Sequence, residues 1–418
     1  MIKIGLRTPK LLSLCITTFF TLTVFAQQPA RRSLSLQNAP DLPAPVPRGS
    51  NPVPADAESA ILAAFDRYEV VGLSAAHGNK DLDDFVLRLI RNPAFPAKVN
   101  DVVVECGNSL YQPILNRYIA GDDVPLTQVR EVWRNTTQPM CGLSSFYEQL
   151  FPVIRRINQR LPPENKLRVL AADPPIDWNK ITSARDFGQG QFLKQRDANI
   201  AAVMEKEVLA KHRKALMLFG AAHLFHVGET AVALYEEKYP GVTLVIGDHT
   251  GFGNWTPLSK YNDKFEARLA SWAVPSLVVN LRGTWLADLL DQTYSSGNIV
   301  FGPVSGGKLP AGAANPRGTF ADVPPEAQAK FSTLVDAYLY LGPRDLLLNQ
   351  PTSAEVVLDK AYMTELQRRA ELTRVMMDEA NPQKIFERDT NPFFYDPDEL
   401  LRFEQPSAMD GQQLSPVH

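Results

Sequence analysis

The sequence contains few cysteines and histidines for its length, three and six in 418 residues. It lacks a repeat of fixed period, which excludes solenoid and propeller architectures. It also lacks a Gly-x-Ser-x-Gly elbow, so a serine nucleophile of that kind is not indicated. Basic residues are not in excess, because 43 Lys and Arg face 46 Asp and Glu. This balance excludes nucleic acid as a partner, since phosphate recognition requires a basic face.

The first 26 residues follow the order of an export signal. Lys3, Arg7 and Lys10 precede an apolar run from 11 to 25, and Ala26 closes the segment with a small side chain. The run is shorter than the roughly 20 apolar residues that a membrane span requires. We therefore expect cleavage of 1–26 and a secreted or periplasmic protein without a stable membrane anchor. The expected partner is a small-molecule substrate. After cleavage, 40 basic groups would face 46 acidic groups, a formal charge of −6.

Cleavage would leave Cys106 and Cys141 as the only cysteines. In an oxidising compartment a pair of cysteines is more often a disulfide than a metal or catalytic site. Spacing alone does not fix the geometry of such a bond, so free thiols stay open as an alternative.

Proline is concentrated near the start of the expected mature chain. Residues 27–54 contain seven prolines, which predicts an extended linker that buries little, with the folded part beginning near Ala57. An α/β core is expected over 55–262. Residues 263–418 are expected to continue the same domain and to add a helical C-terminal part.

Short β-branched runs alternate with amphipathic helical patterns after residue 57. Strands are predicted over 68–73, 102–105, 167–172, 215–219, 242–246, 276–281 and 337–341. Asn79 is a plausible cap for a following helix, and Ser145 to Glu148 have the pattern of a capping box. The alternation predicts an α/β fold with a mainly parallel sheet and helices on both faces, which is a three-layer sandwich.

Titratable residues follow four of the predicted strands, where the carboxyl ends of a parallel sheet bind ligands. They are, in chain order, His77, Glu105, Asp173 and His223, with His226 three residues later. His249 follows a fifth strand as a reserve member. A single histidine or glutamate of this kind is often structural, but four successive strand ends favour a site.

The order of these segments resembles the erythromycin esterase family and its relatives, the Tiki and the ChaN-type haem-uptake families. The resemblance rests on Leu73-Ser-Ala-Ala-His77-Gly78, Val102-Val-Val-Glu105, Arg196-Asp197 at a helix start, and Gly220-Ala-Ala-His223. It covers about residues 65 to 250. One position departs from the family pattern, because the glutamate expected three residues before the first histidine falls on Ser74.

The resemblance implies a secreted hydrolase that cleaves an ester or a related bond. His77, Glu105 and His223 would be catalytic, with His77 taking a proton from water and Glu105 orienting or sharing that role. His223, with Arg196, would stabilise the developing oxyanion. Asp173, Arg196 and His226 would surround the centre and contact the substrate.

Two other functions fit the same residues. His77, Glu105 and His223 are two imidazoles and a carboxylate, a ligand set of hydrolytic zinc sites, so a divalent metal ion or haem handling is the first alternative. His226 or Asp173 could complete such a site. A catalytically inactive binding protein on the same fold is the second alternative.

Overall fold

The computed structural model describes residues 44–75, 78–250, 259–293 and 330–373. All of them belong to one compact unit that begins at Asp41. The expected export signal, the linker up to residue 43 and His77 lie outside the described residues. In the described part of the chain, no helix is both long and apolar enough to cross a membrane.

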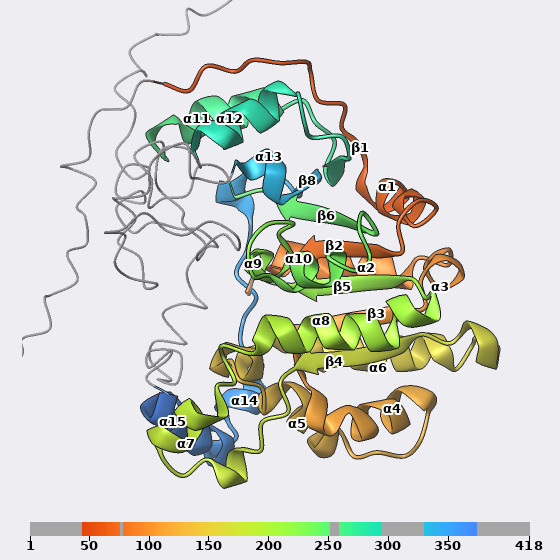
Figure 1. The fold of residues 1–418 in the computed structure, drawn as a ribbon, viewed down its shortest axis with the longest axis vertical. Helices are drawn as coiled ribbons and strands as arrows, with labels where there is room; N and C mark the ends of the chain where they lie inside the picture. The colour runs from red at the N-terminus through yellow and green to blue at the C-terminus, as the bar shows by residue number, and fades with distance from the viewer. Residues whose placement is uncertain (1–43, 76–77, 251–258, 294–329, 374–418) are drawn as a thin grey trace, which may run out of the picture. The chain divides into compact units, whose positions relative to one another are not determined.

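The described strands form one eight-stranded sheet in the order β1-β7-β8-β6-β2-β5-β3-β4 (Figure 1). The strands are β1 (Ala55–Asp56), β2 (Val70–Ser74), β3 (Asp101–Asn108), β4 (Arg168–Asp173), β5 (Ala215–Phe219), β6 (Thr243–Asp248), β7 (Ser276–Val278) and β8 (Ala337–Tyr340). All neighbours from β8 to β4 pair in parallel, whereas β7 is antiparallel to both β8 and β1. The predicted α/β class with a mainly parallel sheet is confirmed.

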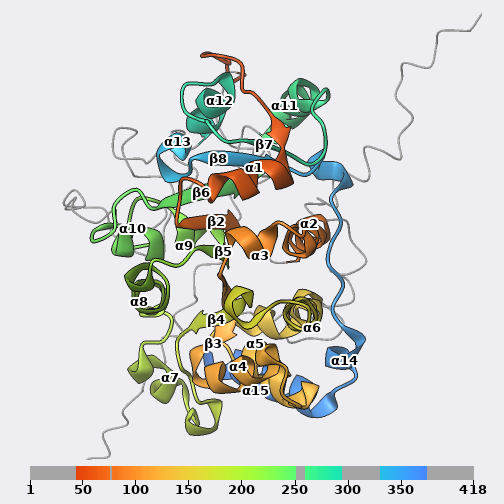
Figure 2. The ribbon, with the colours of Figure 1, turned by 90° about the vertical axis from the view of Figure 1, so that its right-hand side faces the viewer.

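Helices cover both faces of this sheet. The described helices are α1 (Ala57–Ala64), α2 (Lys80–Arg91), α3 (Phe95–Lys98), α4 (Gln112–Ala120), α5 (Leu126–Arg134), α6 (Ser145–Asn158), α7 (Ala184–Gly190), α8 (Arg196–Glu207), α9 (Ala221–Leu224), α10 (Ala231–Glu236), α11 (Asn262–Leu269), α12 (Trp285–Thr293), α13 (Phe331–Leu334), α14 (Ala354–Val357) and α15 (Lys360–Thr373). Figure 2 shows α2, α3 and α6 on one side of the central strands and α8, α9 and α10 on the other.

Alternation along the central strands explains the two apolar layers. Val71 and Leu73 of β2 enter the core shared with α2 and α6, whereas Val70 enters the core shared with α8 and α10. β3 alternates in the same way, with Val102 and Val104 on the first side. Because successive side chains point to opposite faces, a strand covered on both faces reads as a continuous apolar run.

Two local predictions about helix starts had different outcomes. Asn79 caps α2, since its side chain accepts a hydrogen bond from the amide of Leu82. The capping box at 145–148 is wrong, because Ser144 is the residue that precedes α6 and Ser145 Oγ instead donates to the carbonyl of Pro351. Glu148 pairs with Arg130 at 2.9 Å. Tertiary partners therefore outcompeted the local capping pattern.

The last part of the proline-rich segment is docked on the fold, so the predicted start near Ala57 is too late. The amides of Val46 and Arg48 donate to the side chains of Gln292 and Asp288 of α12. Residues 55–56 then pair with β7 as β1. Proline removes its own donor, but the amides between prolines still require partners, and α12 supplies them.

The predicted disulfide is confirmed. Cys106 of β3 and Cys141 are bonded, with their Cα atoms 5.3 Å apart, and both side chains are fully buried. The bond joins β3 to the short helical turn of residues 139–143, immediately beside the strand end that carries Glu105.

Candidate functional site

The carboxyl ends of β3, β4 and β5 lie side by side and carry three of the expected residues. Glu105 lies in the last part of β3 and Asp173 is the last residue of β4. His223 lies in α9, which follows β5 after a single residue, Gly220. Arg196, the first residue of α8, reaches the same place from one face of the sheet. Residues from separate parts of the sequence are thus brought together by adjacent parallel strands.

Arg196 is the centre of this cluster. Its Nη2 donates to Glu105 Oε1 at 2.8 Å, and its Nε donates to Asp173 Oδ1 at 2.9 Å. Its Nη1 lies 3.2 Å from His223 Nε2. The guanidinium is buried, and Asp173 and Glu105 raise its pKa against the opposing effect of burial. The sequence prediction placed Arg196 on the rim, but it lies within the cluster.

Glu105 is held at both oxygens. Besides Arg196, the backbone amide of Gly220 donates to Glu105 Oε2 at 2.6 Å. A Cβ atom at position 220 would lie 3.4 Å from Oε2, in van der Waals contact with the carboxylate. Charge-assisted hydrogen bonds of this kind fix both the orientation and the charge of a buried carboxylate.

Asp173 lies beneath Arg196 and is more deeply buried than a rim position would be. Its carboxylate also accepts from the amide and the hydroxyl of Thr137, at 2.5 and 2.9 Å. Burial raises the pKa of Asp173, although Arg196 and Thr137 oppose the shift. Its position makes Asp173 an anchor for Arg196 rather than a direct substrate contact.

His223 is the part of the cluster nearest to solvent, with 14% of its side chain exposed. Its Nδ1 lies 2.9 Å from Asp197 Oδ1, and that carboxylate also accepts from the amide of Ala231. Sequence reasoning did not single out Asp197 as a site residue. Its signal was the Arg196-Asp197 pair in the family resemblance.

The charges around His223 favour the imidazolium. Burial alone would lower the pKa of His223, but Asp197 and Glu105 outweigh burial and Arg196 and raise it to about 9. The 3.2 Å contact with Arg196, taken alone, would require a neutral ring that accepts at Nε2. We assign the charged ring, because three carboxylates would otherwise face one guanidinium in a buried cluster.

His226 belongs to a different cluster. Its two ring nitrogens lie 2.7 Å from Glu236 Oε2 and Asp336 Oδ2, which tie α10 to the residue before β8. Asp336 also accepts from the amide of Val245 in β6. The expected place of His226 at the rim of the Glu105 site is not what the structure shows, because the chain turns between His223 and His226 toward β6 and β8.

This second cluster predicts a pH-dependent stability. Burial lowers the pKa of His226, but Asp336 and Glu236 outweigh it and raise the pKa to about 9. A rise from the ordinary 6.5 corresponds to about 3 kcal/mol, present below about pH 6.5 and lost as pH rises through about 9. His226→Gln should therefore lower the free energy of unfolding at pH 6 more than at pH 10. His212→Gln, at an exposed position, is the control. Equal losses at both pH values would contradict this assignment.

The remaining expected positions lie at the β6 and β2 strand ends. His249 is buried between Tyr338 and Glu266, 2.5 and 2.7 Å from its two ring nitrogens. Ser74, where the family pattern has glutamate, donates to Asp248 Oδ1 at 2.5 Å. These partners of His249 and Ser74 do not include a residue of the Arg196 cluster. His249 is therefore not part of that cluster.

Two of the three residues of the metal alternative, Glu105 and His223, lie in the described part of the chain. In the part of the chain that the structure covers, no three His, Cys, Asp or Glu side chains are arranged to hold a metal ion. Glu105 Oε1 and His223 Nε2 both face Arg196, so a guanidinium occupies the place that a cation would take between them. His77 lies outside the described residues.

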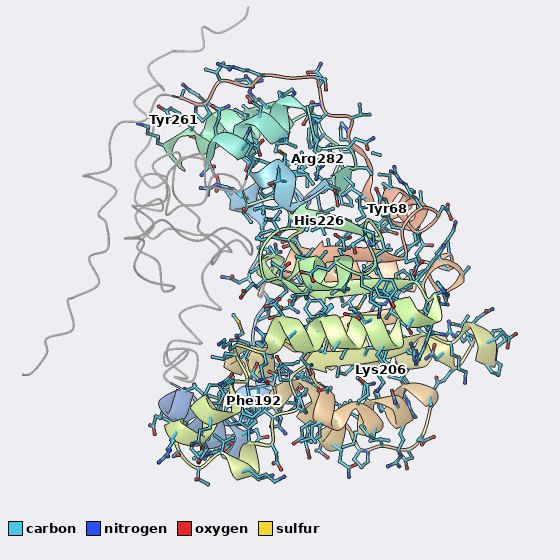
Figure 3. All side chains as sticks on the ribbon, in the orientation of Figure 1. Tyr68, Phe192, Lys206, His226, Tyr261 and Arg282 are labelled. Atoms are coloured by element: carbon cyan, nitrogen blue, oxygen red, sulfur yellow. A yellow bond between two sulfur atoms is a disulfide. The ribbon has the colours of Figure 1, made fainter. Side chains whose placement is uncertain are left out.

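One large cavity in the described part of the chain does not coincide with this chemistry. It measures about 810 Å³ and follows the free edge of β4 between α4 and α8. Gln112 fills that edge, since its amide donates to the carbonyl of Val169 and accepts from the amide of Ala171. Figure 3 shows Lys206, one of its lining residues, on α8 beside β4. None of the expected site residues lines this cavity.

Comparison with known proteins gives structural likeness only. No family model and no curated protein matches the chain. Solved structures that resemble it include a Bacillus cereus protein (13% identity, 71% of this chain and 94% of that chain, TM-score 0.39). A succinoglycan biosynthesis protein is 11% identical, and the match covers 70% of this chain and 94% of that protein with a TM-score of 0.43. The haem-binding ChaN of Campylobacter jejuni is 13% identical, and the match covers 47% of this chain and 87% of that protein with a TM-score of 0.30. Likeness at this level says nothing of activity, so the chemistry has to come from the site itself.

Proposed function

We propose that this protein is a hydrolase that cleaves an ester or a related acyl bond with water activated at the Glu105, Arg196 and His223 cluster. The observation that supports it is the arrangement of two cations, Arg196 and His223, beside a fixed carboxylate at the carboxyl ends of adjacent parallel strands. A purely structural ion-pair network would also bury these charges. Such a network does not require a partly exposed imidazole like that of His223.

The two cations suit an oxyanion. Attack on an ester carbonyl places negative charge on the carbonyl oxygen, and donors fixed beforehand stabilise that charge most effectively. His223 is held by Asp197 on one nitrogen and keeps its other nitrogen 3.6 Å from Glu105 Oε1. In the proposed reaction the Nε2 proton turns from Glu105 to the oxyanion when the substrate enters, and Arg196, 3.2 Å from the same nitrogen, adds positive charge.

The reaction in this proposal needs no covalent intermediate. The water oxygen bonds to the acyl carbon, and its proton passes to His77, the base that the family resemblance implies. Glu105 orients the water or shares that role. The tetrahedral intermediate then releases the alcohol, which takes a proton from the acid formed in the first step. The products are a carboxylic acid and an alcohol.

The test is hydrolysis of a panel of aryl and alkyl esters by the purified protein after treatment with a chelator. His223→Gln should lower kcat/KM by about 10²-fold to 10³-fold, because it removes a charged donor to the oxyanion. His212→Gln is the matched control, since His212 is exposed and precedes β5, whereas His223 follows that strand. Absence of any ester cleavage by the wild-type protein, or full activity of His223→Gln, would contradict the proposed function.

A further inference from the structure

The helix α15 docks at the β4 end of the sheet, far from the strand that precedes it. Four strands, β6, β2, β5 and β3, separate β8 from β4 in the sheet, so the chain crosses the sheet before α15 begins. Figure 1 shows α15 beside α7, at the lower left. The helix therefore comes to the side of the sheet that carries Asp173, although the two are remote in sequence.

Arg369 joins α15 to the end of α5. Only 6% of its side chain is exposed. Its Nη1 donates to the carbonyl of Arg134 and its Nη2 to Asn135 Oδ1, both at 2.7 Å. Its Nε donates to Glu365 Oε1 at 2.6 Å, within the same helix. Tyr362 of α15 adds a hydrogen bond to the Arg134 carbonyl at 3.1 Å. Because all three nitrogens of the planar guanidinium are occupied, they fix the end of α5 relative to α15.

The residues that Arg369 binds lead directly to Thr137, which anchors the Arg196 cluster. A single residue separates Asn135 from Thr137. Thr137 donates to Asp173 from both its amide and its hydroxyl, and Asp173 in turn accepts from Arg196 Nε. A displacement of Asn135 would therefore pass to the Arg196 guanidinium through two successive hydrogen-bonded contacts.

A second path from Arg369 to the same segment runs through Trp178. The guanidinium lies over the indole ring, 4.8 Å from its centroid. The indole Nε1 donates to the carbonyl of Thr136 at 3.1 Å. A contact between a cation and an aromatic face is stronger when both groups are removed from water, and both of these side chains are buried. The two paths meet at the residues immediately before Thr137.

We propose that α15 is a clamp on the proposed hydrolytic site and that Arg369 is a positioning residue, which keeps Thr137 on Asp173 and so fixes Arg196. The kinetic part of this inference rests on the function proposed above, and the structural part does not. The partners of Arg369 lie outside the Arg196 cluster, so its effect on the reaction passes through Arg196. Misplacement of a catalytic group by about 1 Å can cost about 10²-fold in rate.

Amide hydrogen exchange at Thr137 in the full-length protein tests the structural part. In the wild type this amide donates to a buried carboxylate and should exchange slowly. In Arg369→Met it should exchange about tenfold faster or more, because the segment loses its donors from α15. Arg368→Met is the matched control, since Arg368 also binds Glu365 but directs its other donors to carbonyls of residues 178–181. Thr137 should keep its wild-type exchange rate in this control.

Two outcomes of the exchange experiment would overturn the inference. One is an unchanged Thr137 rate in Arg369→Met, and the other is an equal acceleration in Arg369→Met and Arg368→Met. Arg369→Lys serves where Arg369→Met does not fold, because lysine keeps the charge but lacks the fork that binds Arg134 and Asn135 together. Thr137 should again exchange faster than in the wild type, and the wild-type rate would overturn the inference.

Ester cleavage by the same variants tests the kinetic part. Arg369→Met should lower kcat by about tenfold with KM nearly unchanged, because the loss falls on a donor that acts in the transition state. Arg368→Met should retain the wild-type kcat. An active wild-type protein with an equally active Arg369→Met variant would overturn the positioning role and leave the proposed function intact. A wild-type protein that cleaves no ester would overturn the proposed function and this kinetic role, whereas exchange at Thr137 would still decide whether α15 is a clamp.

Discussion

Replacement of Arg196 by methionine should lower the free energy of unfolding by about 3 to 5 kcal/mol. Methionine matches much of the volume of arginine but leaves Glu105 and Asp173 buried without their shared cation. Breaking a buried ion pair by removing one partner costs this much, because the remaining charges stay away from water. Denaturant titration monitored by far-UV circular dichroism measures the change.

Arg213→Met provides a matched control for this prediction. Arg213 also binds a buried carboxylate, Asp101, but Arg168 binds the same carboxylate through two nitrogens. Loss of Arg213 therefore leaves Asp101 paired and should cost far less than loss of Arg196. Adding Glu105→Gln and Asp173→Asn to Arg196→Met should recover part of the lost stability, because both stranded charges disappear. Similar losses for the Arg196 and Arg213 variants would contradict the central place of Arg196.

Removal of the disulfide should have the second large effect. The Cys106 to Cys141 bond closes a segment of 35 residues, and the chain-entropy relation gives about 3 to 4 kcal/mol for a loop of that length. The variant with both cysteines replaced by alanine should unfold at correspondingly lower denaturant concentration. It should also lose activity below its own unfolding transition, since Cys106 directly follows Glu105 on β3.

Chemical reduction separates the bond from the side chains. The wild-type protein in excess dithiothreitol keeps both sulfur atoms, so its loss of stability reports the bond alone, whereas the alanine variant adds the small voids left by two buried sulfurs. The reduced protein should fall between the oxidised protein and the alanine variant. Unchanged stability on reduction would contradict the disulfide.

The central sheet could be predicted from the sequence because its strands are buried on both faces. The strand predicted over residues 215–219 has the same bounds in the structure. The observed bounds of β4 and β6 differ from the predicted ones by one or two residues at each end. β1 and the antiparallel direction of β7 could not be predicted. β1 has only two residues, and its pairing with β7 depends on a contact across more than 200 positions of sequence, which local patterns do not encode.

The sequence allowed most residues of the site to be identified, but not the contacts that they make with one another. Glu105, Asp173 and His223 could be identified because they follow adjacent strands, and Arg196 because it opens a helix in the family pattern. Arg196 contacts these three side chains because of the direction in which α8 crosses the sheet. The spacing of residues along the sequence does not encode that direction. His226 was misplaced for the same reason: three residues separate it from His223, yet its partners Glu236 and Asp336 lie toward β8.

The most direct test of the proposed hydrolytic site is kcat/KM for ester cleavage by Glu105→Gln, measured after chelation and at a temperature where circular dichroism shows the variant folded. Glutamine keeps the length of the side chain but removes the charge that Arg196 and Gly220 hold in place. We expect a loss of about 10³-fold or more, because the water loses its acceptor and Arg196 loses its fixed position. Activity within about tenfold of the wild type would show that hydrolysis does not pass through this carboxylate and would contradict the account.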